Sequence, residues 1–311
     1  MLARLRFLIL GLWLGCLASA DLHAATSVVI VSSESNAAYT ETAQALVEEL
    51  ERSGISRSEV LLLRASEWPL ARAPAARLYV TLGAEAAGRL ARSELAAPLL
   101  CALLPRSSFE RVLQQSGRKA SPLVSAIVLD QPMSRQLELI RIALPTVRRI
   151  GVLWGAQMAA EAPALKAQAL SHGLQLTEAA VAEEEPVFPA LRQVLEASDL
   201  LLAIPNPQVY NSASIQNILL TSFRARVPML AFSAAYARAG ALLSLQATPS
   251  QIGLQAGAMA RAVLHGKALP EAPVYSNDFE ITVNDHVARS LGLKLDAQSL
   301  HKRLRQREGE P

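Results

Sequence analysis

The sequence predicts an α/β protein built from two doubly wound, parallel-sheet lobes. Short runs of apolar or β-branched residues alternate with longer helical patterns along the chain, which is typical of βαβ units. Several runs are apolar without interruption, such as residues 28–31, and this indicates strands covered by helices on both faces. The runs form one set in each half of the chain, so we expect two similar lobes.

The expected strands lie at comparable intervals in the two halves. Those of the first half are residues 27–32, 60–64, 77–83, 98–103 and 125–129, and those of the second half are residues 149–154, 174–181, 199–204, 228–233 and 241–245. Between them, apolar residues recur every three or four positions, as on the buried face of a helix. Ala43, Leu46 and Leu50 are one example.

Helix ends are marked as well. Thr248, Pro249 and Gln251 have the spacing of a capping box with proline in the first helical position, which predicts the start of a helix. Gly54 and Gly173 follow helical patterns where a left-handed residue is favoured.

The N-terminus has the pattern of a secretory signal peptide. Arg4 and Arg6 precede a short uncharged apolar run, residues 7–17, and small residues follow at 18–20. The run is shorter than the roughly 20 apolar residues that a membrane-spanning helix needs. We therefore expect export to the periplasm rather than a membrane anchor.

The cleavage position is left open by the sequence. Cleavage after Ala20 and cleavage near Ala24 both fit, and we take residues 1–24 as the signal peptide. Cys16 raises the alternative of a lipoprotein. Trp13 stands where a lipid-attachment site usually has leucine, which favours soluble export.

Composition excludes several classes of protein. With 30 basic and 27 acidic residues, the net charge of +3 gives no basis for nucleic-acid binding. The basic residues gather in residues 301–311, which we interpret as a solvated basic tail.

Cys101 is the one cysteine left after export, so no internal disulfide forms, and its apolar surroundings indicate a buried thiol. Hydrophobic residues make up 51% of the chain, enough for substantial cores.

The sequence does not indicate an enzyme. It lacks the metal-binding H-E-x-x-H, the nucleophile pattern G-x-S-x-G and the dinucleotide pattern G-x-G-x-x-G. Gly83 and Gly88 have the spacing of a phosphate-binding loop, but Arg89 and Leu90 follow instead of lysine and a hydroxyl residue. We expect no catalysis, no cofactor and no metal.

A small-molecule site is expected between the lobes. In open parallel sheets ligands bind beyond the carboxyl ends of the strands, and two such sheets make a cleft that closes by a hinge. The residues in the corresponding loops are Ser32, Ser33, Glu34, Gly83, Ala84, Arg106, Ser107, Asp130, Trp154, Asn206, Ser233 and Tyr236. Each has a structural alternative: Ser33 and Asn206 suit turns or caps, Trp154 suits a core, and Arg106 suits a solvated loop.

From about residue 125 onward the sequence resembles the ABC-transporter substrate-binding family that includes the TrpX-like, tryptophan-binding proteins. Residues 136–139, Leu144-Pro145 and 149–153 match a family passage read as QLELL…LP…RIGVL. Residues 281–284, with Ala288 and 291–293, match its C-terminal pattern of VN…A…LG. The first hundred residues share mainly the rhythm of strands and helices.

The resemblance implies a type I periplasmic-binding fold whose lobes are crossed three times by the chain. Lobe one would then comprise residues 25–130 plus 249–270, and lobe two residues 131–248 plus 271–300. It also implies that the protein delivers its ligand to a membrane permease, and we expect a monomer.

Several residues depart from the family at positions that contact its ligands. Gly83-Ala84 replaces the usual Gly-Thr, and residues 104–108 replace a loop with Asp-Pro and glycine. Thr248 and Asn206 stand where aspartates are common. Specificity for aromatic amino acids is therefore not expected to carry over. Glu34 or Asp130 could supply a negative charge, and Arg106 could bind a carboxylate.

Two other functions remain open. The closed, liganded form could be presented to a membrane sensor instead of a permease. Alternatively, the lobe pair could serve as a protein-interaction scaffold that binds no solute.

Overall fold

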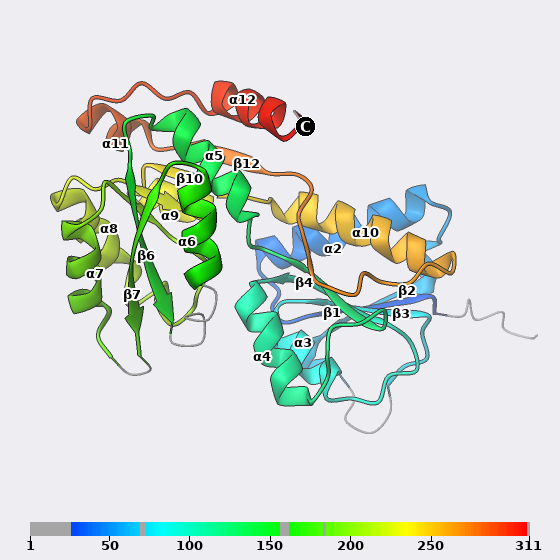
Figure 1. Cartoon of the computed structure of the whole chain (residues 1–311). Coiled ribbons are helices and arrows are strands. Elements are labelled where there is room, and N and C mark those ends of the chain that lie inside the picture. Colours follow the sequence, from blue (N-terminus) through cyan, green and yellow to red (C-terminus); the bar gives the residue numbers. More distant parts are fainter. Residues whose placement is uncertain (1–25, 69–72, 156–161, 183–184, 310–311) are drawn as a thin grey trace, which may run out of the picture.

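The computed structural model describes residues 26–68, 73–155, 162–182 and 185–309. Two α/β lobes lie side by side, each with a six-stranded sheet flanked by helices (Figure 1). The expected signal peptide, residues 1–24, lies outside the described residues. Within the described ranges, no helix has the length and apolar character needed to span a membrane.

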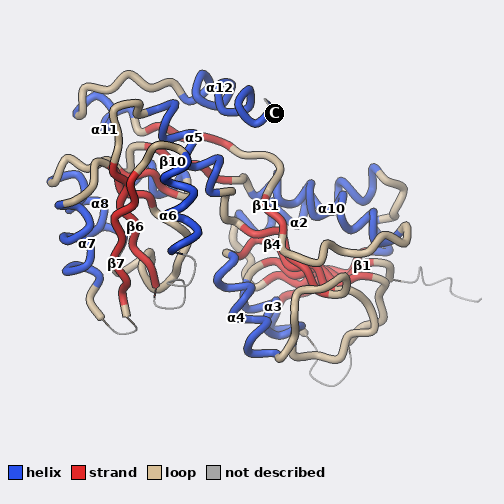
Figure 2. Tube along the Cα trace, viewed as in Figure 1, coloured by secondary structure: helices blue, strands red, loops and turns tan. Residues whose placement is uncertain are grey.

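Lobe one contains a fully parallel sheet. Its strand order is β11 (Val274–Tyr275), β5 (Val124–Val128), β4 (Leu99–Leu104), β3 (Leu78–Leu82), β1 (Val28–Ser32) and β2 (Val60–Arg64). Helices α2 (Ala37–Arg52) and α10 (Pro249–Leu264) pack on one face, and α3 (Ala84–Ala91) and α4 (Arg106–Ser116) on the other (Figure 2). Short 3-10 turns, Arg57–Glu59 and Ala65–Glu67, flank β2.

Helix α10 joins lobe one from the far end of the sequence, and two glycines let it lie close against α2. A Cβ atom on Gly253 would meet the backbone oxygen of Thr42 and lie 2.8 Å from the Cβ of Ala45. One on Gly257 would lie 2.6 Å from the Cβ of Glu49. Any larger residue would push the helices apart.

Lobe two has the same architecture with one antiparallel edge strand. Its order is β12 (Glu280–Val283), β10 (Leu243–Gln246), β9 (Met229–Ala231), β8 (Leu200–Leu202), β6 (Arg149–Gly155) and β7 (Gln175–Val181), with β12 antiparallel to β10. Helices α5 (Met133–Ala143) and α6 (Ala162–Ser171) pack on one face, and α7 (Val187–Glu196) and α8 (Ile215–Arg224) on the other. The remaining helices are α9 (Ala234–Ala239), α11 (Asp285–Ser290) and α12 (Ala297–Gly309).

The structure confirms the predicted α/β class and the ten expected strands, which correspond to β1–β10. The capping box at Thr248 is also confirmed. The Thr248 side chain accepts from the N–H of Gln251, and the Gln251 side chain accepts from the N–H of Thr248. Gly54 and Gly173 have φ angles of +87° and +71°, as expected at helix ends.

Two expected boundaries were wrong. Residues 271–300 were assigned to lobe two, but β11 pairs with β5 in lobe one. Residues 301–311 were interpreted as a solvated tail, but most of them belong to α12. Leu300 and Leu304, one turn apart, bury one side of this helix against lobe two.

The chain crosses between the lobes three times, as the resemblance implies, after β5, β10 and β11. The third crossing is held from both sides. Gln255 of α10 donates to the Tyr275 carbonyl at 3.0 Å, and Arg305 of α12 donates to the Asn277 carbonyl at 3.1 Å. Arg135 of α5 donates to the Ser276 carbonyl at 3.2 Å. The bonds from the two lobes therefore meet at Ser276–Asn277.

Candidate ligand-binding site

In lobe one, the ends of β1 and β3 meet through Ser33 and Gly83. The N–H of Ser33 donates to the carbonyl of Leu82 at 2.9 Å, and its hydroxyl accepts from the N–H of Ala86 at 2.9 Å. Gly83 has φ +90° and ψ 166°, a conformation that other residues rarely adopt. Ala84 follows as the first residue of α3. These predicted residues thus lie together at the carboxyl ends of two neighbouring strands of the sheet.

Tyr39 completes this cluster, although the sequence does not mark it as a site residue. A Cβ atom on Gly83 would lie 2.6 Å from both the Tyr39 hydroxyl and the Ser33 hydroxyl. Burial raises the pKa of Tyr39, and the nearby carboxylates of Glu34 and Glu85 raise it further. Glu34 itself is exposed and accepts a hydrogen bond from the Asn36 amide at 2.7 Å.

The ends of β4 and β5 are joined by Arg106 and Asp130. The buried Asp130 carboxylate accepts from the backbone N–H of Arg106 at 2.7 Å, so it acts as a cap for α4. The Arg106 guanidinium lies 5.2 Å from the ring centroid of Tyr275 in β11 and 4.0 Å from Glu110. The Ser107 hydroxyl is buried and finds no hydrogen-bond partner among the described residues.

In lobe two, the buried Asn206 follows β8 and packs against Gly155 at the end of β6. A Cβ atom on Gly155 would lie 2.5 Å from the Asn206 amide nitrogen. The Asn206 side-chain oxygen accepts from the N–H of Gln208 at 2.9 Å, and the Gln208 amide donates to the Val181 carbonyl at 2.9 Å. These bonds tie together the ends of three neighbouring strands, and they give Asn206 the turn role that was its structural alternative.

Trp154 is 3% exposed and belongs to the hydrophobic core of lobe two. Its indole N–H donates to the Glu178 carboxylate of β7 at 2.6 Å. This placement matches the core alternative for Trp154.

An aromatic cluster follows β8 and β9. Ser233 caps α9 by accepting from the N–H of Tyr236, whose ring lies 5.1 Å from that of Phe232. Phe232 in turn contacts Tyr210 edge to face at 5.7 Å. Burial raises the pKa of both tyrosines, and it is the largest cause for each. Tyr210 is buried and its hydroxyl has no partner within the described part of the chain.

The structure therefore groups Ser33, Gly83 and Ala84 with Tyr39, joins Arg106 to Asp130, and places Ser233 and Tyr236 beside Phe232 and Tyr210, whereas Trp154 lies in the core. Tyr39 lies in the first turn of α2, and it was not predicted because only residues that directly follow strands were considered. Tyr210 lies in the long segment after β8, away from the strand end that guided the selection.

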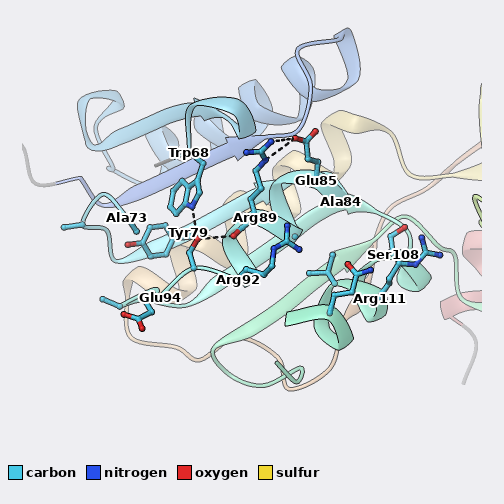
Figure 3. Close-up of a pocket in the computed structure, with 16 residues that line it drawn as sticks. Trp68, Ala73, Tyr79, Ala84, Glu85, Arg89, Arg92, Glu94, Ser108 and Arg111 are labelled. Carbon is cyan, nitrogen blue, oxygen red and sulfur yellow. Dashed lines mark hydrogen bonds and ion pairs between the residues drawn. The ribbon is translucent and has the colours of Figure 1, made fainter. Parts of the chain in front are cut away.

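Two hollows in lobe one are distinct in character. One of about 620 Å³ between α2 and β2 is lined by Ser32, Glu34 and Tyr39. Another of about 970 Å³ lies between α3, α4 and Trp68, and Arg92 and Arg111 line it (Figure 3). The first hollow adjoins the predicted site, whereas the second contains Ala84 alone of the predicted residues. No group of three or more potential metal ligands occurs in the described ranges.

Two lobes of parallel sheet, crossed three times by the chain, define a type I periplasmic-binding-protein fold. Residues 73–303 match the sequence profile of the family described as ABC transporter substrate binding protein. The chain belongs to this family, whose members bind small ligands.

A curated relative is the tyrosine-binding protein of Clostridioides difficile strain R20291. It is 22% identical over 193 residues, which are 60% of this chain and 54% of the relative. The matched region thus spans about half the length of that protein.

Solved structures show the same fold. A domain from Streptococcus pneumonia in complex with L-Trp has 18% identity and a TM-score of 0.62, covering 89% of this chain and 98% of its own. A ligand-free, open substrate-binding protein with adhesive properties from Clostridium difficile has 18% identity and a TM-score of 0.66, covering 88% and 97%.

Proposed function

We propose that the protein captures a small solute between its lobes in the periplasm and delivers it to the membrane permease of an ABC importer. The observation that carries this proposal is the placement of polar side chains beyond the carboxyl ends of parallel strands in both lobes. Ligands of open α/β sheets bind at such ends. The export pattern of residues 1–24 supports the periplasmic location.

The charges of the cluster suggest how the solute is oriented. Arg106 would receive a carboxylate or another anionic group, because the acid nearest to its guanidinium among the described residues is Glu110, at 4.0 Å. Asp130 already accepts the N–H of Arg106, so Glu34 is the better placed acid for a cationic group. Tyr236 would contact an apolar part of the solute.

The known ligands of the relatives are starting points only. The tyrosine-binding relative and the structure with L-Trp make amino acids the first compounds to test. Asn206 and Ala84 change the charge and hydroxyl pattern of the family, so we do not propose aromatic amino acids as the ligand. The class we propose is a small solute that carries an anionic group.

Thermal unfolding against a library of amino acids, small carboxylates, purines and sugars tests the proposal. A ligand at 100 times its dissociation constant adds about 2.7 kcal/mol of stability and raises the midpoint clearly. Arg106→Gln should weaken binding by about 10- to 100-fold, because a hydrogen bond to a charged group contributes about 1.5–3 kcal/mol.

Arg111→Gln is the matched control, since Arg111 lies on the same helix but lines the other hollow. It should leave the affinity within about twofold. A folded protein that responds to nothing in the library would instead favour a role as a protein-interaction scaffold.

A further inference from the structure

The outer face of lobe two carries a groove between α7 and α8 that the solute site does not use. Its volume is about 910 Å³, and Leu195 and Val227 are among the apolar residues that line it. Phe188, on the groove wall, is 51% exposed. Phe188 thus adds an exposed aromatic side chain to the apolar residues of the groove.

One end of the groove is basic. Arg224 and Arg226 line it, are exposed, and form no ion pair with any acid of the described residues. The two acids that also line the groove are paired with other arginines, Asp199 with Arg149 at 2.6 Å and Glu196 with Arg192 at 3.7 Å. An acidic group entering the groove would therefore meet two available guanidinium groups.

Arg226 occupies a backbone position that this chain elsewhere gives to glycine. Its φ is +56°, and it ends α8 in a Schellman motif: its N–H donates to the Phe223 carbonyl at 3.0 Å, and that of Val227 donates to Ser222 at 3.1 Å. The same pair of bonds ends six other helices of the described ranges, each with a glycine at a positive φ: Gly54, Gly117, Gly173, Gly240, Gly266 and Gly292.

A left-handed conformation is unfavourable for arginine and free of strain for glycine. Residues kept in such conformations concentrate at functional positions, because folding alone would favour their replacement. The exposed guanidinium of Arg226 is therefore a candidate for contact with a group outside the chain.

We infer that the α7–α8 groove is a docking site for a partner protein, which inserts a segment with acidic side chains flanking an apolar one. The apolar side chain fills the groove beside Phe188, and the acidic groups meet Arg224 and Arg226. A hollow of about 910 Å³ between two helices can take up an inserted segment, whereas the flat surface of a membrane cannot fill it. This surface is separate from the solute site and does not depend on it.

The test uses a short fluorescent peptide in which glutamates flank leucine and phenylalanine, added to the full chain. The wild type should bind it, and binding should weaken with salt. The double variant Arg224→Gln/Arg226→Gly should bind at least about tenfold more weakly. Its unfolding midpoint should not fall, because glycine relieves the left-handed residue.

Matched controls separate docking from general attraction between charges. Arg111→Gln removes an exposed arginine on lobe one and should leave affinity within about twofold. A peptide with alanine in place of its leucine and phenylalanine should bind clearly more weakly. Failure of the wild type to bind, or equal binding of the alanine peptide, would overturn the inference. Binding instead to phosphatidylglycerol vesicles, lost in the double variant, would assign the surface to a membrane and also overturn it.

Discussion

Gly83 offers a sharp test of how the first strand ends are assembled. The change is Gly83→Ala, which adds a single methyl group between β3 and α3. The backbone conformation at Gly83, φ +90° and ψ 166°, is essentially restricted to glycine and costs another residue about 1–3 kcal/mol. The new Cβ would also lie 2.6 Å from the hydroxyls of Ser33 and Tyr39, and overpacking adds about 1–3 kcal/mol.

The expected loss in the free energy of unfolding is therefore about 2–6 kcal/mol. Urea denaturation followed by circular dichroism measures it. Gly117→Ala is the matched control, because Gly117 also has a positive φ, +67°, but nothing lies within 4 Å of its added Cβ. Its loss should be about 1 kcal/mol.

The difference between the two variants reports the contact with Ser33 and Tyr39 together with the larger backbone strain at Gly83. Gly83→Ala should also weaken solute binding, because it displaces two side chains of the site. Equal losses in the two variants would show that the close approach of Gly83 to these hydroxyls is not present in the protein.

Three further predictions concern other parts of the molecule. Leu304→Ala should cost about 2–4 kcal/mol of stability in urea denaturation, because Leu304 is fully buried. Arg303→Ala, at the exposed neighbouring position, should change the stability by no more than about 0.5 kcal/mol. Similarly small losses in both variants would mean that this segment is a solvated tail after all. The pKa of Asp199 is lowered, mainly by the hydrogen bond from Arg149. The ionised Asp199 therefore stabilises the folded protein above the ordinary aspartate pKa, and this stabilisation is lost as the pH falls below about 4. Asp199→Asn should remove this loss of stability at acidic pH, and an unchanged pH profile of stability would count against the Arg149–Asp199 ion pair. Burial raises the pKa of Cys101 to about 12, so a thiol reagent at pH 8 should modify it, as judged by peptide mass, in denaturant but not in the folded protein.

The strands could be placed from the sequence because each one is a short apolar run buried on both faces. The run at 28–31 and the capping box at Thr248 are both signals that tertiary contacts reinforce rather than override. Strand β11 was missed because it has only two residues, Val274–Tyr275, too few for a pattern. Helix α12 was misinterpreted because its basic residues dominate and only Leu300 and Leu304 mark its buried side.

The candidate site was harder to predict than the fold. Ser33 and Gly83 follow strands directly, so the rule for strand ends selects them. Tyr39 lies on a helix and Tyr210 in a long connecting segment, yet both pack beside predicted site residues. The spacing of residues along the sequence does not reveal such contacts. Trp154 was selected by position, yet its side chain turns to Glu178 on the neighbouring strand, which depends on a pairing register that the sequence does not reveal.

The central claim is that the lobes close around a solute, and a distance between the lobes tests it most directly. Fluorophores attached at Arg111→Cys on α4 and Lys166→Cys on α6 report this distance by energy transfer, while the buried Cys101 stays unlabelled. The compound that raises the unfolding midpoint should shift the transfer efficiency to one higher value, and Arg106→Gln should move that shift to higher ligand concentration. A compound that stabilises the protein while the transfer efficiency remains unchanged would contradict closure of the lobes around a solute.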